Sequence, residues 1–153
     1  MLLCRFAFYS RRTGIVADAQ EEDRELLRIL QAGLRNNPRH GLTGVLLVDG
    51  PHFVQVLEGP RSLLYPTLKR IESNPHHDDL VLTGYSEVGE RMFDDWSVYV
   101  RTPPARLEGT PWIPNPQLAT HGQVIETARR VCGVKAGVRQ IRAADLPPEN
   151  EGF

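Results

Sequence analysis

Two adjacent apolar segments in the middle of the chain constrain its fold most. Residues 42–49 are almost entirely apolar, which predicts a strand buried on both faces. A turn follows at 49–52, and residues 53–58 predict a second strand that ends at Gly59. A hairpin buried on both faces must be covered on each side, either by other parts of the chain or by another subunit.

The remaining periodicities predict an α+β fold of the ferredoxin-like kind, with a β-α-β-β-α-β-β mixed sheet and two helices on one face. Besides the hairpin, strands are expected at 2–10, 80–86 and 96–100, and helices at 20–35 and 62–73. A C-terminal helix is expected at 119–133. Either this helix or a second subunit would cover the sheet face that carries Ala7, Val54 and Val56.

Several signals predict where the helices begin and end. Asp18 is expected to cap the first helix, and the acidic run 21–23 is expected to form a solvated first turn that the helix dipole favours. Pro38 is expected to end this helix, because proline disfavours helical geometry in the preceding residue. Pro66 fits the second helix only in its first turn, where the backbone N–H groups lack helical partners.

Composition shifts predict four segments along the chain. They are a folded domain at 1–100, a proline-rich linker at 101–118, a C-terminal helical segment at 119–144 and a flexible tail at 145–153.

Composition also argues against several classes of function. The 153 residues carry a formal net charge of -1, which does not favour nucleic-acid binding through a basic surface. Cys4 and Cys132 are too few for a disulfide framework or a four-cysteine zinc site. No apolar run approaches the ~18 residues of a membrane span, and no signal peptide is recognised. We therefore expect a cytoplasmic protein without membrane contact, and no metal site at 76–79, because adjacent loop residues seldom converge on one ion.

Two polar features interrupt the apolar pattern. Gln55 shares a strand face with Phe53 and Leu57, where a buried amide without a partner costs about 1–3 kcal/mol. Gln55 is therefore either exposed on an edge strand or hydrogen-bonded to a specific partner. Asn36 and Asn37 follow the apolar stripe of the first helix and are either an ordinary C-cap pair or amides placed for a partner.

Four sequence blocks with matching order and spacing complete the pattern. They are NNPRHGLTG at 36–44, FVQVLEG at 53–59, RIESNPHH at 70–77 and RMFDDWS at 91–97. Together they resemble the BLUF family, blue-light sensors that use FAD, over residues ~2–100.

The resemblance implies that FAD binds between the two helices, with its ring against the sheet. Asn37 would hydrogen-bond the polar edge of the ring beside Asn36, and Gln55 would be the amide that switches on illumination. Arg70 and His77 would contact the polar edge or the tail of the flavin. The apolar walls would come from Leu26, Ile29, Leu30, Leu64 and Ile71, with Phe8 on the sheet.

The chain departs from the family pattern at the photochemical position. The family's Tyr-x-Ser is Phe8-Tyr9-Ser10 here, so Phe8 replaces the tyrosine that gives an electron and a proton. Alternatively, a one-residue slip of the alignment would bring Tyr9 to that position. The methionine of the family's WSM block is Val98, and Trp96 remains, with Gln55, as a photochemical switch candidate.

Three functions are compatible with these features. The first is an FAD-binding blue-light photoreceptor with an impaired or altered photocycle, which signals to an unidentified downstream protein partner and is expected, by resemblance, to form a homo-oligomer. The second is a light-independent protein-interaction module on the same scaffold. The third, a flavin-dependent enzyme, is not expected, since no general acid or base is placed for it.

Overall fold

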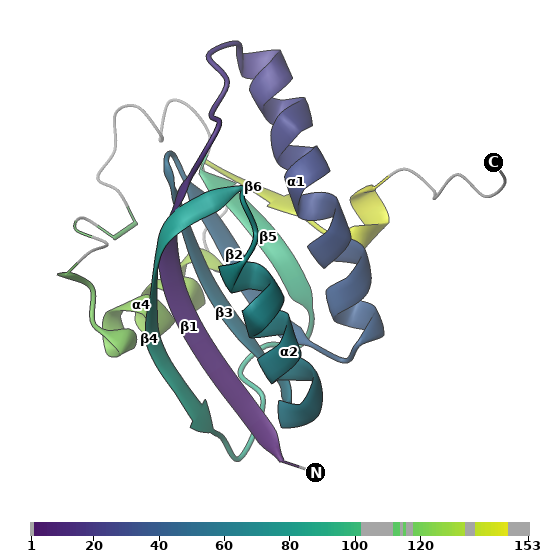
Figure 1. The fold of residues 1–153 in the computed structure, drawn as a ribbon, viewed down its shortest axis with the longest axis vertical. Helices are drawn as coiled ribbons and strands as arrows, with labels where there is room; N and C mark the ends of the chain where they lie inside the picture. The colour runs from purple at the N-terminus through teal and green to yellow at the C-terminus, as the bar shows by residue number, and fades with distance from the viewer. Residues whose placement is uncertain (1, 102–111, 114, 116–117, 134–136, 147–153) are drawn as a thin grey trace, which may run out of the picture.

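The described residues form a six-stranded mixed sheet with helices on both faces (Figure 1). This computed structural model describes residues 2–101, 112–113, 115, 118–133 and 137–146. The strands are β1 (Leu3–Arg12), β2 (Thr43–Asp49), β3 (His52–Pro60), β4 (His77–Glu87), β5 (Trp96–Arg101) and β6 (Val138–Ile141). The helices are α1 (Ala19–Arg39), α2 (Arg61–Glu72) and α4 (His121–Val131), and a short 3-10 helix spans Ala143–Asp145.

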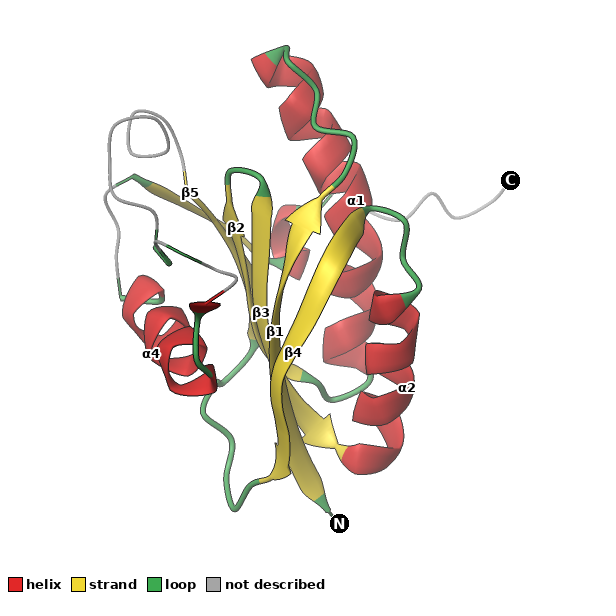
Figure 2. Ribbon diagram, turned by 60° about the vertical axis from the view of Figure 1, so that its left-hand side comes forward, coloured by secondary structure: helices red, strands yellow, loops and turns green. Residues whose placement is uncertain are grey.

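The strand order is β4-β1-β3-β2-β5-β6, so the apolar hairpin β2–β3 lies in the middle of the sheet. All neighbouring strands are antiparallel except β2 and β5, which are parallel. Figure 2 shows α1 and α2 on one side of the sheet and α4 on the other. The predicted α+β, ferredoxin-like β-α-β-β-α-β-β order, with two helices on one face and a C-terminal helix, is confirmed.

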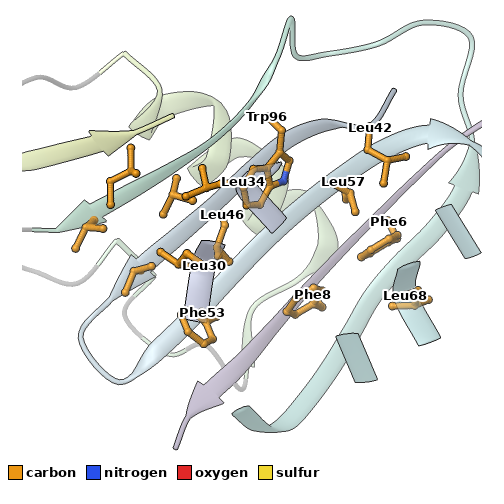
Figure 3. Packing of buried hydrophobic residues seen from close by; sticks show 14 of the residues in the cluster. Phe6, Phe8, Leu30, Leu34, Leu42, Leu46, Phe53, Leu57, Leu68 and Trp96 are labelled. Atoms are coloured by element: carbon orange, nitrogen blue, oxygen red, sulfur yellow. The ribbon is translucent and has the colours of Figure 1, made fainter. Parts of the chain in front are cut away.

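Two hydrophobic cores hold these layers together. The first lies under α1 and α2, and Figure 3 shows its aromatic and leucine side chains, among them Phe6, Phe8 and Trp96, on one face of the sheet. The second contains Ala7, Val54 and Val56 on the opposite face, packed with α4 side chains. The helix, rather than a second subunit, therefore covers the face that the sequence left open.

Helix α1 begins where the sequence predicts and ends later. The Asp18 carboxylate accepts hydrogen bonds from the N–H groups of Gln20 and Glu21, at 3.1 and 2.9 Å, as an N-cap should. The prediction that Pro38 ends the helix is wrong, because the helix continues to Arg39. Its stop signal is Gly41, which has a positive φ of 68°, a conformation that glycine adopts without a steric penalty.

This extension changes the place of two candidate residues. Asn36 and Asn37 lie in the last turn of α1 rather than at its C-cap, which is His40. Their backbone carbonyls accept from the N–H of His40, and the Asn37 carbonyl also accepts from Leu42. Because the backbone closes the helix end by itself, both side-chain amides are left available for other partners.

The acidic first turn of α1 also differs from its prediction as a solvated segment. Glu22 is only 6% exposed and pairs with Arg12 at 2.5 Å. Arg12 belongs to β1, which was expected to end at residue 10 but continues through Arg12 and pairs there with β4. The guanidinium also lies over the Phe53 ring, 5.7 Å from its centroid. This long-range partner could not be read from helix periodicity.

Two further elements depart from the expected pattern. Pro66 lies inside α2 rather than in its first turn. It is tolerated because both Pro66 and Ser62, whose carbonyl loses its helical donor, are exposed to water. Strand β6, in the segment expected to be helical at 119–144, pairs with β5 and buries Ile141 in the first core.

The C-terminal region is only partly described. Most of the linker expected at 101–118 and of the tail expected at 145–153 lies outside the described residues. Within the linker, Trp112 and Ile113 pack on the second core.

We expect Glu22→Ala to lower the free energy of unfolding by about 3–5 kcal/mol, because it leaves the buried Arg12 charge without its partner. Urea denaturation followed by circular dichroism measures this loss. Asp23→Ala in the same turn is the matched control, since the Asp23–Arg139 pair is exposed on both sides and is worth less than about 1 kcal/mol. Equal losses in the two variants would contradict the assignment.

Candidate flavin site

A cavity of about 330 Å³ lies between α1, α2 and the sheet. This volume is at the lower end of the ~300–1,000 Å³ typical of small-molecule sites. All the side chains singled out above for the polar contacts and the photochemistry line it, together with three of the expected apolar residues, although they come from six different elements. They are Phe8 of β1, Ile29, Leu30, Asn36 and Asn37 of α1, Gln55 of β3, Arg70 and Ile71 of α2, His77 of β4 and Trp96 of β5.

Three amides in the cavity wall have no hydrogen-bond partner among the described residues. No described residue donates to or accepts from the side chains of Asn36, Asn37 or Gln55. Gln55 is only 5% exposed and Asn37 8%, so both have lost most of their water. Each amide offers two N–H donors and one carbonyl acceptor. The wall therefore presents unused hydrogen-bonding groups to whatever fills the cavity, and a heterocycle with mixed donors and acceptors on one edge fits them.

The register of β1 determines which of Phe8 and Tyr9 faces the cavity. Phe8 lies directly opposite Gln55 in the β1–β3 ladder and lines the cavity. Tyr9 lies opposite Val54 and packs in the second core under α4. Successive residues of a strand point to opposite faces, so Tyr9 cannot face the cavity without a shift of the whole strand. The side chain that faces the cavity from β1 is therefore Phe8.

Trp96 of β5 contributes its indole ring to the cavity wall. It is 4% exposed, and its buried Nε1–H has no hydrogen-bond acceptor among the described residues. The absence of a side chain at Gly33 allows the ring to lie against α1, since a Cβ there would stand 3.2 Å from Trp96 Cη2. Val98, at the position of the family's methionine, is fully buried in the first core and does not line the cavity.

His77 is held by the protein through both ring nitrogens. Its Nε2 lies 2.6 Å from the Ile71 carbonyl oxygen, which can only accept, so Nε2 carries a proton. In the neutral ring Nδ1 then accepts from the Ser10 hydroxyl at 2.7 Å. The ring meets Phe8 and Phe53 edge-on, with centroids 6.0 and 6.2 Å apart. His77 thus braces the wall between β1 and α2, and its nitrogens are already used.

The polar end of the cavity is basic. Arg70 donates to the Thr67 hydroxyl at 2.9 Å and has no carboxylate partner among the described residues. Asn74 and His76 also line the wall, and none of the lining residues that the structure describes is Asp or Glu. This mouth is therefore suited to an anionic group such as a phosphate.

Sequence reasoning named some wall residues wrongly and missed others. Leu26 and Leu64, expected in the walls, lie in the first core and do not line the cavity. The helical stripe identifies a buried face but cannot say which of its leucines border an open space. Gly33, Thr67 and His76 were not anticipated, and only their spacing from Asn37, Arg70 and His77 could have indicated them.

Other site types find no support in the described part of the chain. No three His, Cys, Asp or Glu side chains there come together as ligands of a metal ion would. Nor does any helix in those ranges combine the length and apolar character needed to cross a bilayer.

The similarity to solved structures extends over nearly the whole chain. The dark-state structure of BlrB, a BLUF protein, is 24% identical with a TM-score of 0.63, over 95% of this chain and 98% of that one. The ground-state structure of BlsA is 16% identical with a TM-score of 0.71, over 94% of each chain. At these identities the two structures support the fold.

Sequence relatives match a shorter region. A photoactivated adenylate cyclase subunit beta from Euglena gracilis is 31% identical over 75 residues, which make up 48% of this chain. The chain spans only 9% of that relative's length. The model of the BLUF family, described as sensors of blue-light using FAD, matches residues 3–99. With this match over more than half of its length, the chain belongs to the BLUF family of FAD-using blue-light sensors.

Proposed function

We propose that this chain binds the ring system of FAD in the cavity and responds to blue light by a route that does not use a tyrosine in β1. The observation that carries the proposal is the set of three amides, Asn36, Asn37 and Gln55, that have no partner in the described part of the chain and surround an otherwise largely apolar space. A pocket with apolar walls and a few placed polar groups is typical of cofactor sites.

The amides divide the binding between them. Asn37 and Gln55 are buried and would hydrogen-bond the polar edge of the flavin ring. Because these residues are already largely removed from solvent, their hydrogen bonds to the flavin would cost little further desolvation. Asn36 is more exposed and would contact the same edge from the rim. Ile29, Leu30 and Ile71 would pack on the faces of the ring. Arg70, at the basic mouth, is the candidate for the phosphates of the tail, which the cavity is too small to enclose.

The family's photochemistry cannot proceed unchanged with Phe8. Bound flavin supplies a chromophore that becomes an electron acceptor when it absorbs blue light. A phenyl ring has no proton to give and resists oxidation, so Phe8 cannot serve as the donor. Trp96 is the aromatic group of the wall that can give up an electron, and its N–H is buried without an acceptor. We therefore assign Trp96 as donor and Gln55 as the amide that responds.

The output of the sensor is proposed to pass to a protein partner. The relative from Euglena is named for a photoactivated adenylate cyclase, and this chain covers only 9% of it. We infer that this sensor domain is itself non-catalytic, that it signals to a protein partner and that it forms a homo-oligomer.

A light-independent interaction module is the second candidate. The observation that favours it is the joint replacement of the photoactive tyrosine by Phe8 and of the methionine by Val98. Under this alternative the cavity would not hold flavin tightly, and the protein would bind its partner equally in the dark and in the light.

An absorption spectrum of protein purified from flavin-replete cells, recorded in the dark and under blue light, separates the candidates. Stoichiometric flavin with a light response other than the family's reversible red shift is the expected result. Flavin with the ordinary red shift would overturn the assigned role of Phe8. Protein purified without flavin would contradict the photoreceptor and favour the light-independent interaction module.

We expect Phe8→Tyr to give the flavin-loaded protein a reversible red shift of the flavin absorption under blue light that the wild type lacks. The new hydroxyl would be carried by the residue opposite Gln55, where it supplies both a hydrogen-bond partner and a proton. Tyr9→Phe is the matched control and should leave both spectra unchanged, because Tyr9 lies under α4. A flavin-loaded Phe8→Tyr protein without the shift would show that the hydroxyl is not the missing element.

Gln55→Leu should change stability in opposite directions with and without flavin. In flavin-free protein it replaces an amide that has no partner among the described residues by an apolar side chain, at a residue that is only 5% exposed, and should raise the free energy of unfolding by about 1 kcal/mol. In the presence of flavin it should weaken binding about tenfold, because a hydrogen bond to the ring is lost. Urea denaturation and fluorescence titration measure the two effects. Gln31→Leu, in α1 but outside the cavity wall, should show neither.

A further inference from the structure

Glu58 is a fully buried carboxylate that the cavity does not use. It lies in β3 on the face opposite Gln55 and has 0% exposure. Four donor groups satisfy it. Arg5 Nε and the Thr43 hydroxyl reach it at 2.9 Å, and the N–H groups of Met92 and Phe93 reach it at 3.0 and 2.8 Å. Hydrogen bonds to a charged acceptor are about twice as strong as neutral ones.

These contacts tie down the β4–β5 loop, residues 88–95. The Met92 and Phe93 bonds come from the loop backbone, and two further bonds come from the partners of Glu58. Arg5 donates a second hydrogen bond to the Glu90 carbonyl at 3.0 Å. Arg91 donates to the Thr43 hydroxyl at 2.8 Å, which leaves the Thr43 proton for Glu58. Four consecutive residues of the loop are thereby anchored to one carboxylate and its two partners.

The anchored loop leads directly into Trp96. Phe93 packs on the second core, under α4, whereas Trp96 belongs to the first core and lines the cavity. The chain therefore crosses from one face of the sheet to the other within three residues. Between them, the Asp95 carbonyl accepts from the Gly44 N–H at 2.9 Å, one residue from Thr43. The direction in which the chain enters β5 thus depends on the Glu58 contacts.

We propose that Glu58 is a positioning residue that sets the orientation of the Trp96 indole in the cavity wall by holding the β4–β5 loop. The importance of that orientation for light sensing rests on the proposed function, but the positioning itself does not require flavin. A carboxylate is needed because every group around it is a donor. A glutamine would direct its NH₂ group at two of those donors and release part of the loop.

The two tryptophans of the chain allow a direct test. Protein labelled with 5-fluorotryptophan gives one ¹⁹F resonance each for Trp96 and Trp112, assigned with Trp112→Phe. In Glu58→Gln we expect the Trp96 resonance to shift by more than its linewidth or to split, while the Trp112 resonance stays in place. Amide exchange of Met92 and Phe93 should accelerate roughly tenfold, because each loses a charge-assisted bond.

Asp49→Asn is the matched control for removing a largely buried carboxylate that is paired with an arginine. The Asp49 carboxylate accepts from the backbone N–H of Trp112 at 2.9 Å and from Arg101 Nη1 at 3.1 Å, away from the β4–β5 loop. This variant should move the Trp112 resonance and leave that of Trp96. A Trp96 resonance unchanged in folded Glu58→Gln, or moved equally by both variants, would overturn the proposal.

Two provisions keep the test decisive. If Glu58→Gln does not fold, Thr43→Val removes one donor of Glu58 and the acceptor of Arg91, and the same criteria apply to it. The spectra are recorded with and without flavin. A failure of every variant to bind flavin would count against the proposed function, whereas an unmoved Trp96 resonance in flavin-free protein would count against the positioning role alone.

Discussion

Strand β1 lies between β3 and β4 and is hydrogen-bonded on both sides, so its register is fixed over its whole length. That register places Phe8 opposite Gln55 and Tyr9 opposite Val54. A slip of one residue would exchange the two faces and expose the apolar side chains of both cores to the wrong layer. Sheet pairing therefore decides which β1 side chain belongs to the cavity wall. The hydrogen bonds that hold the sheet together keep the Tyr9 hydroxyl, next to Phe8 in sequence, on the other face.

The cavity combines apolar packing with polar groups that the protein leaves unpaired. The buried indole N–H of Trp96 has no acceptor among the described residues, which costs stability on the order of 1–3 kcal/mol. The surrounding core, from Phe6 to Trp96, supplies the packing that makes such groups tolerable. His77 illustrates the opposite case, because Ser10 and Ile71 satisfy both of its nitrogens and turn it into a rigid brace. The distinction between free and satisfied groups separates ligand-facing residues from supporting ones.

Periodicity was sufficient to predict the order of elements, because this depends on local patterns, whereas most of the cavity wall was implied only by the family resemblance that four short motifs carry. The apolar hairpin at 42–58 became the centre of the sheet, and α1 began at its predicted cap. The errors concern long-range contacts. Glu22 is buried because Arg12 reaches it from β1, and α1 passes Pro38 because Gly41 closes it. Strand β6 was missed because four residues that pair with β5 carry too little pattern to be recognised.

A hydrogen-bonded chain also joins α4 to the backbone of β1, through β4, next to a residue of the cavity wall. The β1–β4 ladder contains an irregularity between Ala7 and Phe8, so Thr83 has no direct partner in the register. Its hydroxyl donates to the Ala7 carbonyl at 3.1 Å and, with that proton engaged, accepts from His121 Nδ1 at the start of α4. Because Gly84 has no side chain, the imidazole can sit directly on the strand, where a Cβ would lie 2.6 Å from Nδ1. The first turn of α4 is thus fixed to the backbone of β1 one residue from Phe8, and any displacement of Phe8 along the strand must strain or break this contact.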